Sequence, residues 1–194
     1  MLLKNKADVI NLIQSDEKMM EIIHTASILD LPDWWICAGF VRSKIWDTLH
    51  GYKERTSIPD VDVIYFDGAN MDEKYEKKLE NKLKKLMPDI PWSVKNQARM
   101  HRVNRIPPYT SSEDAISKFP ETATALGVNL DKEHELTLTA PCGIEGVLQM
   151  EVKPTPFFTE TRERAVIFDE RLINKNWTAK WPMVSVYPIT SPSR

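Results

Sequence analysis

Two aspartates, Asp60 and Asp62, stand two residues apart at the start of a stretch rich in β-branched residues. Residues two apart on a strand point to the same face of a sheet, so these carboxylates are expected to lie side by side. Two such charges repel each other, and a divalent cation relieves the repulsion. Mg²⁺ prefers oxygen ligands and completes its shell with water and substrate phosphate. The pair is therefore predicted to hold Mg²⁺ or Mn²⁺ and to take part directly in catalysis.

A second feature lies upstream, where a short apolar run ends at Gly39 and a helical pattern follows. A glycine at a strand-to-helix turn lets the backbone approach a ligand closely. The helix behind it offers free N–H groups and the positive end of its dipole to phosphate oxygens. The first turn adds charged and hydroxyl donors. We therefore expect the following residues to bind a nucleotide: Gly39, Phe40, Arg42, Ser43 and Lys44.

Each feature is weak when it is taken alone. An Asp-x-Asp pair is more often two solvent-facing residues at the start of a strand, and a glycine before a helix is less specific still. Their order is stronger evidence: strand, glycine, amphipathic helix, loop, and then a strand with two aspartates. This order indicates a site for a nucleoside triphosphate and a divalent metal, in which positioning and charge neutralisation carry the chemistry.

Hydrophobic periodicity predicts the elements that position these residues. The stretch from 6 to 29 is expected to be helical and to divide at the cap signal Ser15-Asp16. The clearest helix runs from 72 to 87, and its charged face is interpreted as solvated rather than as a nucleic-acid contact. Strands are expected at 34–38, 61–66, 92–95, 137–139 and 147–152. These elements predict an α/β fold. We expect one domain over 1–194, with N-terminal helices at about 6–30 and a C-terminal wrap at about 157–194.

Composition sets the protein class. Charged residues make up 28% of the 194 residues and apolar residues 42%, which is typical of a globular protein. The formal charge of −2 argues against a broad nucleic-acid-binding surface, although not against a local basic groove. Cys37 and Cys142 are interpreted as free thiols in a reducing compartment. No apolar run approaches the roughly 20 residues of a membrane span, and the N-terminus lacks a signal-like stretch. We therefore expect a cytoplasmic protein with no membrane contact.

Two further groups of side chains leave alternatives open. The polar residues Asn96, Gln97, Arg99 and His101 either contact the base, ribose or acceptor, or cap a helix and pair locally. Of these, Asn96 is retained as a nucleotide-binding candidate. In the C-terminal region, the tryptophans at 177 and 181 stand near lysines and are stacking candidates, although packing remains the default interpretation.

The two motifs together resemble a known family. Ala38-Gly39-Phe40-Val41-Arg42, with Leu49-His50-Gly51 closing the helix, is similar to the Gly-Gly-x-Val-Arg-Asp…Leu-Leu-Gly signature of CCA-adding enzymes and bacterial poly(A) polymerases. Asp60-Val61-Asp62-Val63 resembles their Asp-x-Asp strand. The resemblance implies a polymerase-β-like nucleotidyltransferase fold, an α+β mixed sheet flanked by helices. It also implies a phosphate turn at Gly39 and metal ligands at Asp60 and Asp62. The whole chain resembles a group of small stand-alone bacterial nucleotidyltransferase-like proteins.

The chain departs from the family pattern at several positions. Ala38 replaces the first glycine, and Ser43 stands where CCA-adding enzymes have an aspartate. The third carboxylate of the fold is expected on the strand at 92–96, which carries no acid. Glu151 supplies that carboxylate only if its own strand runs alongside. The Glu-Asp-x-x-Arg base-reading motif and the helical tRNA-holding body are also missing from the sequence, so a CCA-adding enzyme itself is not expected.

These observations support a metal-dependent nucleotidyltransferase. Such an enzyme transfers a nucleoside monophosphate from an NTP to a hydroxyl acceptor, which is an RNA, a protein or a small molecule. The alternative is a catalytically impaired module on the same fold that binds nucleotide or docks a partner, and the missing third carboxylate favours it. A weaker alternative is a toxin-like or antitoxin-like transferase.

Overall fold

The computed structural model describes residues 3–190, so the last part of the expected C-terminal wrap, 191–194, lies outside the described residues. Its centre is a five-stranded mixed sheet in the order β3-β2-β1-β4-β5. Strands β2 and β3 are parallel, whereas β1 is antiparallel to both β2 and β4, and β4 is antiparallel to β5. The strands are β1 Trp35–Cys37, β2 Val61–Tyr65, β3 Trp92–Asn96, β4 Gly127–Leu130 and β5 Leu136–Thr139. The predicted α/β fold with a mixed sheet is confirmed.

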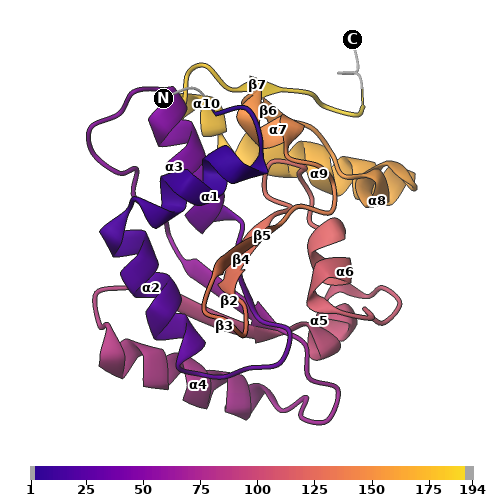
Figure 1. The fold of residues 1–194 in the computed structure, drawn as a ribbon. Coiled ribbons are helices and arrows are strands. Elements are labelled where there is room, and N and C mark those ends of the chain that lie inside the picture. The colour runs from indigo at the N-terminus through magenta and orange to yellow at the C-terminus, as the bar shows by residue number, and fades with distance from the viewer. Residues whose placement is uncertain (1–2, 191–194) are drawn as a thin grey trace.

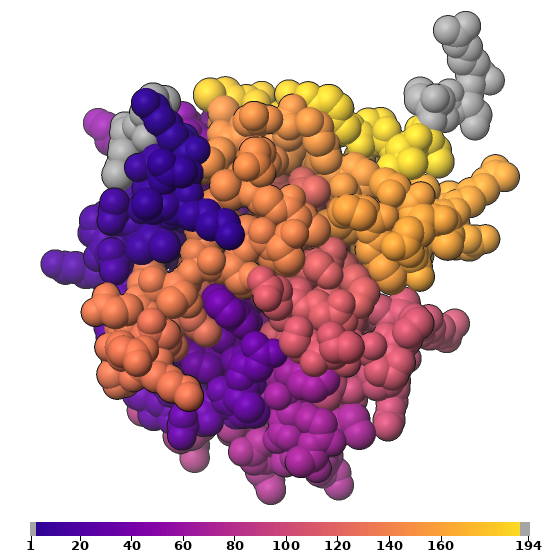
Figure 2. Space-filling model, turned by 45° about the vertical axis from the view of Figure 1, so that its right-hand side comes forward, coloured from indigo at the N-terminus to yellow at the C-terminus, as the bar shows by residue number. Residues whose placement is uncertain are grey.

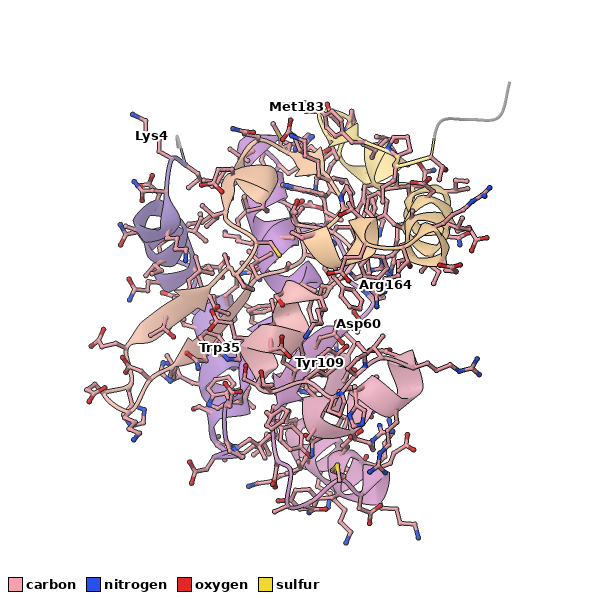
Figure 3. The ribbon with its side chains drawn as sticks, turned by 90° about the vertical axis from the view of Figure 1, so that its right-hand side faces the viewer. Lys4, Trp35, Asp60, Tyr109, Arg164 and Met183 are labelled. Atoms are coloured by element: carbon pink, nitrogen blue, oxygen red, sulfur yellow. The ribbon has the colours of Figure 1, made fainter. Side chains whose placement is uncertain are left out.

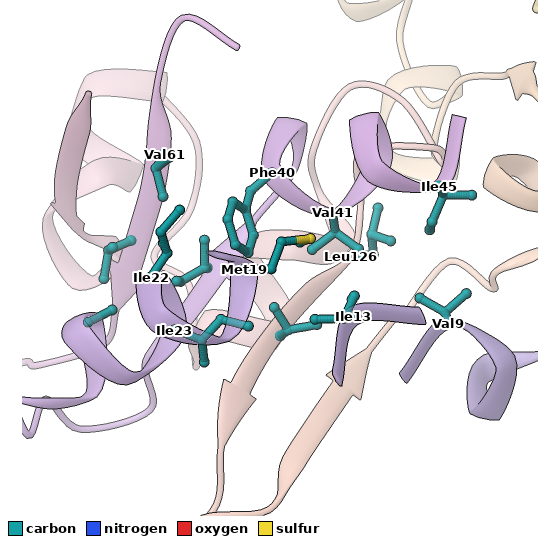
Figure 4. Close-up of a cluster of buried hydrophobic side chains, with 14 of the residues drawn as sticks. Val9, Ile13, Met19, Ile22, Ile23, Phe40, Val41, Ile45, Val61 and Leu126 are labelled. Atoms are coloured by element: carbon teal, nitrogen blue, oxygen red, sulfur yellow. The ribbon is translucent and has the colours of Figure 1, made fainter. Parts of the chain in front are cut away.

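Four helices cover one face of the sheet (Figure 1). They are α1 Lys6–Gln14, α2 Glu17–Ser27, α3 Gly39–Leu49 and α4 Glu73–Leu86. The first two divide where the sequence predicts, because Asp16 caps α2 by accepting from the Met19 N–H. Figure 4 shows apolar side chains of α1, α2 and α3 in one buried cluster, with Ile22 of α2 and Phe40 of α3 near Val61 of β2. Burial of this cluster fixes α3 against β2, the strand that carries Asp62.

Successive residues of β2 point to opposite faces of the sheet. Val61, Val63 and Tyr65 belong to the main core cluster under the helices. Ile64 belongs to a second cluster on the opposite face, together with Cys37 of β1. Asp62 pairs with Cys37 in the antiparallel register, so its side chain points to this second face. The helices α5 Gln97–Asn104 and α6 Ser112–Ser117 lie on that side.

The C-terminal region packs across one end of the sheet (Figure 1). It contains α7 Glu145–Leu148, α8 Pro156–Thr159, α9 Arg162–Lys175 and α10 Trp177–Lys180. A separate two-stranded parallel sheet joins β6 Glu151–Val152 to β7 Ser185–Val186. The strand predicted at 147–152 is therefore wrong in most of its length, because α7 occupies its beginning. Within residues 3–190, no helix is long and apolar enough to cross a membrane.

The turn between β1 and α3 has a strained backbone. Ala38 adopts φ 54° and ψ −115°, a region that residues with a side chain rarely occupy. Two hydrogen bonds hold this conformation: the Ala38 N–H donates to the Leu126 carbonyl at 3.1 Å, and the Arg42 N–H donates to the Ala38 carbonyl at 3.0 Å. The strain costs about 1–3 kcal/mol, which the surrounding packing must offset. Glycine pays no such cost at this position.

We predict that Ala38→Gly stabilises the protein, although Ala→Gly changes usually destabilise. Relief of the positive φ should raise the free energy of unfolding by about 1 kcal/mol, net of the extra chain entropy of glycine. Urea unfolding measures the difference. Ala115→Gly, at a buried helical position of α6, is the control and should destabilise. A loss of stability in Ala38→Gly as large as that in the control would contradict the strain.

Candidate functional site

A cavity of about 270 Å³ lies where the strained turn, the end of the loop before β2 and the C-terminal helices meet. Asp60 and Asp62 both line it, together with Gly39 and Arg42. β2 begins at Val61, so Asp60 is the last loop residue rather than the first strand residue. Asp60 and Asp62 nevertheless face one cavity, as their spacing predicts. The charged residues that line it are Arg42, Asp60, Asp62, Arg171, Lys175 and Lys180, and Gly39 adds its backbone.

The two aspartates are electrostatically coupled. The pKa of the Asp62 carboxyl is raised to about 6, mainly by burial and also by the charge of Asp60. The Ser93 hydroxyl and the cations Lys175 and Arg171 act in the opposite direction. Ser93 is the β3 residue directly opposite Asp62 in the parallel register. The strand that was expected to carry a third carboxylate therefore places a hydroxyl there.

Arg42 is a buried cation at the edge of this cavity. Its side chain is only 9% exposed. Three tryptophan rings surround its guanidinium, with centroids 5.2 Å away for Trp46, 5.3 Å for Trp181 and 5.9 Å for Trp177. The tryptophans at 177 and 181 are themselves almost fully buried, so they pack around Arg42 and do not form an open stacking surface.

The Arg42 guanidinium has few polar partners. Its one side-chain hydrogen bond runs from Nη2 to the Ser43 hydroxyl at 3.3 Å, and Nε has no partner among the described residues. Burial lowers the pKa of Arg42 to about 10, which leaves it charged at neutral pH. No carboxylate forms an ion pair with it in the part of the chain that the structure describes. A buried cation without a counter-ion fits an anionic ligand at this point.

Helices α9 and α10 bring further cations to the same cavity. Arg171 and Lys175 are four residues apart on α9, so both lie on one face of the helix, and Lys180 follows on α10. The fully buried Glu121 fixes Arg171 through an ion pair with its Nε, and Glu121 also accepts from the Thr124 hydroxyl at 2.6 Å. Sequence reasoning missed Arg171. The spacing of four was a signal for a shared face, but nothing indicated that this face meets Asp60.

Three residues predicted for the phosphate site lie elsewhere. Phe40, Ser43 and Lys44 line a neighbouring cavity of about 230 Å³, which shares Ser57 and Ile58 of the loop with the first. The Lys44 ammonium pairs with Asp16 of the α2 cap at 2.8 Å. A helix turns by about 100° per residue, so neighbouring positions of α3 point to different sides. The aspartate cavity therefore receives Gly39 and Arg42, whereas Lys44 has a structural partner.

Asn96 was predicted to bind the nucleotide, but the structure gives its side chain a structural role instead. It is fully buried at the far end of β3 from Ser93. Its amide donates to the carbonyls of Asp67 and Asn70, both at 2.8 Å, and accepts from the backbone of Asp67 and Ala98. These bonds use its hydrogen-bonding capacity, so Asn96 caps α5 and ties down the loop after β2. We leave it out of the proposed site.

Glu151 does not supply the missing carboxylate. It lies on β6 in the separate two-stranded sheet and does not line the aspartate cavity. Its carboxylate accepts from Lys153 at 2.5 Å and from the Tyr187 hydroxyl at 3.0 Å. Within residues 3–190, no cluster of three acidic, histidine or cysteine side chains is placed to hold a metal ion. The hard oxygens of Asp60 and Asp62 fit Mg²⁺ if substrate phosphate and water complete the shell.

Comparison with known proteins places this geometry in context. A family model described as nucleotidyltransferase matches residues 24–186. A solution structure described as revealing a CCA-adding enzyme head domain is 36% identical, with a TM-score of 0.85, and the match covers 95% of this chain and 97% of that one. No curated protein matches the chain.

More distant structures share the fold alone. The Thermotoga maritima CCA-adding enzyme complexed with tRNA is 10% identical, with a TM-score of 0.55, and the match covers 97% of this chain and 44% of that enzyme. A CCA-adding enzyme in complex with ATP is 9% identical, with a TM-score of 0.50 and coverage of 91% and 43%. The predicted resemblance to this fold is confirmed. Because the family model spans most of its length, the chain belongs to this nucleotidyltransferase family.

Proposed function

We propose that the protein binds an NTP with Mg²⁺ or Mn²⁺ and transfers its nucleoside monophosphate to a hydroxyl acceptor. One observation carries this proposal: two coupled carboxylates face a buried, unpaired guanidinium across the same cavity. A triphosphate supplies the negative charge that Arg42 lacks, and a divalent cation neutralises the aspartates. We also propose that the protein is cytoplasmic and bacterial, as its sequence predicts.

Each part of the cavity has a distinct role in this proposal. The Gly39 turn and the N-terminus of α3 bind phosphate oxygens through backbone N–H groups. Arg42, Arg171 and Lys175 neutralise the triphosphate and the leaving pyrophosphate. Asp60 and Asp62 hold the metal, which when bound polarises the α-phosphate and orients the reacting oxygens.

The transfer requires no reactant other than the NTP and the acceptor. The acceptor oxygen forms a bond to the α-phosphorus, and the bond from that phosphorus to the bridging oxygen of pyrophosphate breaks. The hydroxyl proton is released to water. The protein contributes orientation and fixed positive charge at the oxygens where negative charge develops.

A second candidate is a nucleotide-binding module that has lost turnover. Ser93 supports it, because this hydroxyl stands opposite Asp62 where the fold is expected to have a third carboxylate. A serine neither holds a second metal nor accepts a proton as well as a carboxylate does. Pyrophosphate release separates the candidates: the enzyme releases it when the four NTPs are supplied with a pool of hydroxyl-bearing acceptors, and the module does not.

We predict that Asp60→Asn combined with Asp62→Asn abolishes metal-dependent NTP binding and leaves the fold intact. Each amide keeps the size of the carboxylate but removes its charge, so Mg²⁺ should no longer increase the affinity for ATP, which should fall at least about tenfold. Isothermal titration calorimetry measures this loss. Asp89→Asn changes an exposed aspartate outside the cavity and should bind as the parent does. Equal affinity in the double variant and the parent would exclude the metal assignment.

We also predict that Asp62→Asn alone stabilises the metal-free protein at pH 7.5. The raised pKa of Asp62 means that the folded state binds this proton more tightly than the unfolded state does. Parent stability should therefore fall as pH rises from about 4 to about 6 and stay lower above it. Asp62→Asn has no carboxyl to ionise at this position, so it avoids this loss in the free energy of unfolding, which is at most about 3 kcal/mol.

Urea unfolding in EDTA at pH 4 and pH 7.5 tests this prediction. The stabilising effect of Asp62→Asn should be large at pH 7.5 and close to zero at pH 4. Asp89→Asn, at an exposed position outside the cavity, serves again as the control. A variant that is no more stable than the parent at pH 7.5 would contradict the raised pKa of Asp62.

A further inference from the structure

A second cavity, of about 640 Å³, also reaches Asp62. It lies on the second face of the sheet, between the α5–α6 region and helices α8 and α9. Figure 2 shows these two regions on one face of the molecule, with the pink residues of α5 and α6 below the orange residues of the C-terminal region. In Figure 3, Asp60 lies between Arg164 of α9 and Tyr109 of the loop before α6. We call this cavity the second cleft. Asp62 is the residue that it shares with the aspartate cavity.

Four aromatic side chains line the second cleft, together with aliphatic and charged ones. Phe119 follows α6, Phe157 and Phe158 lie on α8, and Tyr109 closes the opposite side. Two of these rings carry cations: the Arg164 guanidinium lies 3.6 Å from the Phe157 centroid, and the Lys118 ammonium lies 5.3 Å from that of Tyr109. Aromatic walls with a few fixed polar groups are typical of small-molecule sites, and the volume is in the range of such sites. They favour a ligand with a flat or apolar body.

One polar side chain of the second cleft is open to a ligand. Gln97 is the first residue of α5, and its side chain is only 6% exposed. Its amide makes no side-chain hydrogen bond to any residue from 3 to 190, although the neighbouring Asn96 is fully bonded. Since Gln97 lines the second cleft, its amide is available to a polar group of a bound ligand.

The charges of the second cleft favour an anion. Cations outnumber carboxylates among its lining residues, which include Lys95, Arg105, Lys118 and Arg164 against Asp62 and Glu163. Three of the cations have a carboxylate partner, whereas Arg105 forms no ion pair in the described part of the chain. Arg105 is exposed and ends α5 in a left-handed conformation, with φ 55°. It is therefore available to an anionic group at the mouth of the cleft.

We propose that the second cleft binds the acceptor of the transfer, and that this acceptor is a small hydroxyl-bearing molecule with an aromatic or apolar body and one anionic group. The role as acceptor rests on the proposed function, because Asp62 then separates the acceptor from the NTP. The chemical class of the ligand is inferred only from the residues that line the second cleft. A small molecule fits better than a nucleic acid, since the chain has a net charge of −2 and the cleft is bounded by protein on both sides.

Methyl NMR of methionine tests the ligand class without NTP or metal. Met100 lines the second cleft and Met19 lines the cavity beside α3, so the two methyl groups report separately. The probes are 4-(hydroxymethyl)benzoate and phenyl phosphate, with uncharged benzyl alcohol and a hexamer of adenylate for comparison. We expect both anionic ring compounds to shift the Met100 methyl resonance and to leave Met19 unchanged. Benzyl alcohol should bind more weakly, because it lacks the anion.

Variants of the cleft make the assignment specific. Gln97→Leu keeps the volume but removes the amide, and it should weaken binding of 4-(hydroxymethyl)benzoate by about tenfold. Arg105→Gln, at an exposed position that should not disturb folding, should weaken both anions and not benzyl alcohol. The matched controls are Gln14→Leu and Arg162→Gln, both exposed and outside the cleft, and they should leave binding unchanged.

Three results would overturn the proposal. The first is that neither anionic probe shifts Met100. The second is equal binding by Arg105→Gln and the parent. The third is tighter binding of the adenylate hexamer than of either small probe, which would point to a nucleic-acid acceptor. Because these titrations contain no NTP, their failure leaves the aspartate cavity unaffected. Failure of NTP binding, in turn, leaves the ligand class of the cleft standing and removes only its role as acceptor site.

Discussion

Burial of the Arg42 guanidinium among three tryptophans is the interaction on which the candidate site depends. Trp46 comes from the same helix, whereas Trp177 and Trp181 come from the C-terminal region. Asp47 reinforces this junction, because it accepts from the Trp181 indole at 2.7 Å and from the Thr56 backbone at 2.8 Å. One turn of α3 therefore fixes both the loop that ends at Asp60 and the helices that carry Arg171 and Lys175. The cost of burying a cation is offset when an anion enters the cavity.

The alternation of β2 explains how one residue serves two cavities. Val61 and Val63 enter the main core, so the position between them must face the other side of the sheet. Asp62 takes that position and borders both the cation-rich cavity and the aromatic second cleft. A donor on one side and an acceptor on the other would meet at this carboxylate. The same arrangement also fits the second candidate, a module that binds nucleotide without transferring it, because Ser93 stands where a third carboxylate is expected.

Sequence reasoning reached the local parts of this arrangement and missed the long-range parts. The Asp-x-Asp pair and the glycine turn are local patterns, and both reach the same cavity. The strand at 92–96 and its lack of an acid also agree with prediction, and the structure places this strand beside β2. By contrast, Lys44 and Asn96 have nearby structural partners that spacing alone does not reveal. The roles of Arg171 and Gln97 depend on how distant segments pack, which periodicity within one element does not encode.

The proposed function depends most on whether the Arg42 side chain binds the triphosphate. The most direct measurement is the ¹⁵N–¹H resonance of the Arg42 Nε, assigned with Arg42→Lys and followed while a non-hydrolysable ATP analogue and Mg²⁺ are added. The Nε–H has no partner among residues 3–190 in the ligand-free protein. A new hydrogen bond to phosphate should therefore shift its proton resonance downfield and slow its exchange with water. If the resonance keeps its position and exchange rate at saturating analogue, the triphosphate does not bind at Arg42, and the account is contradicted.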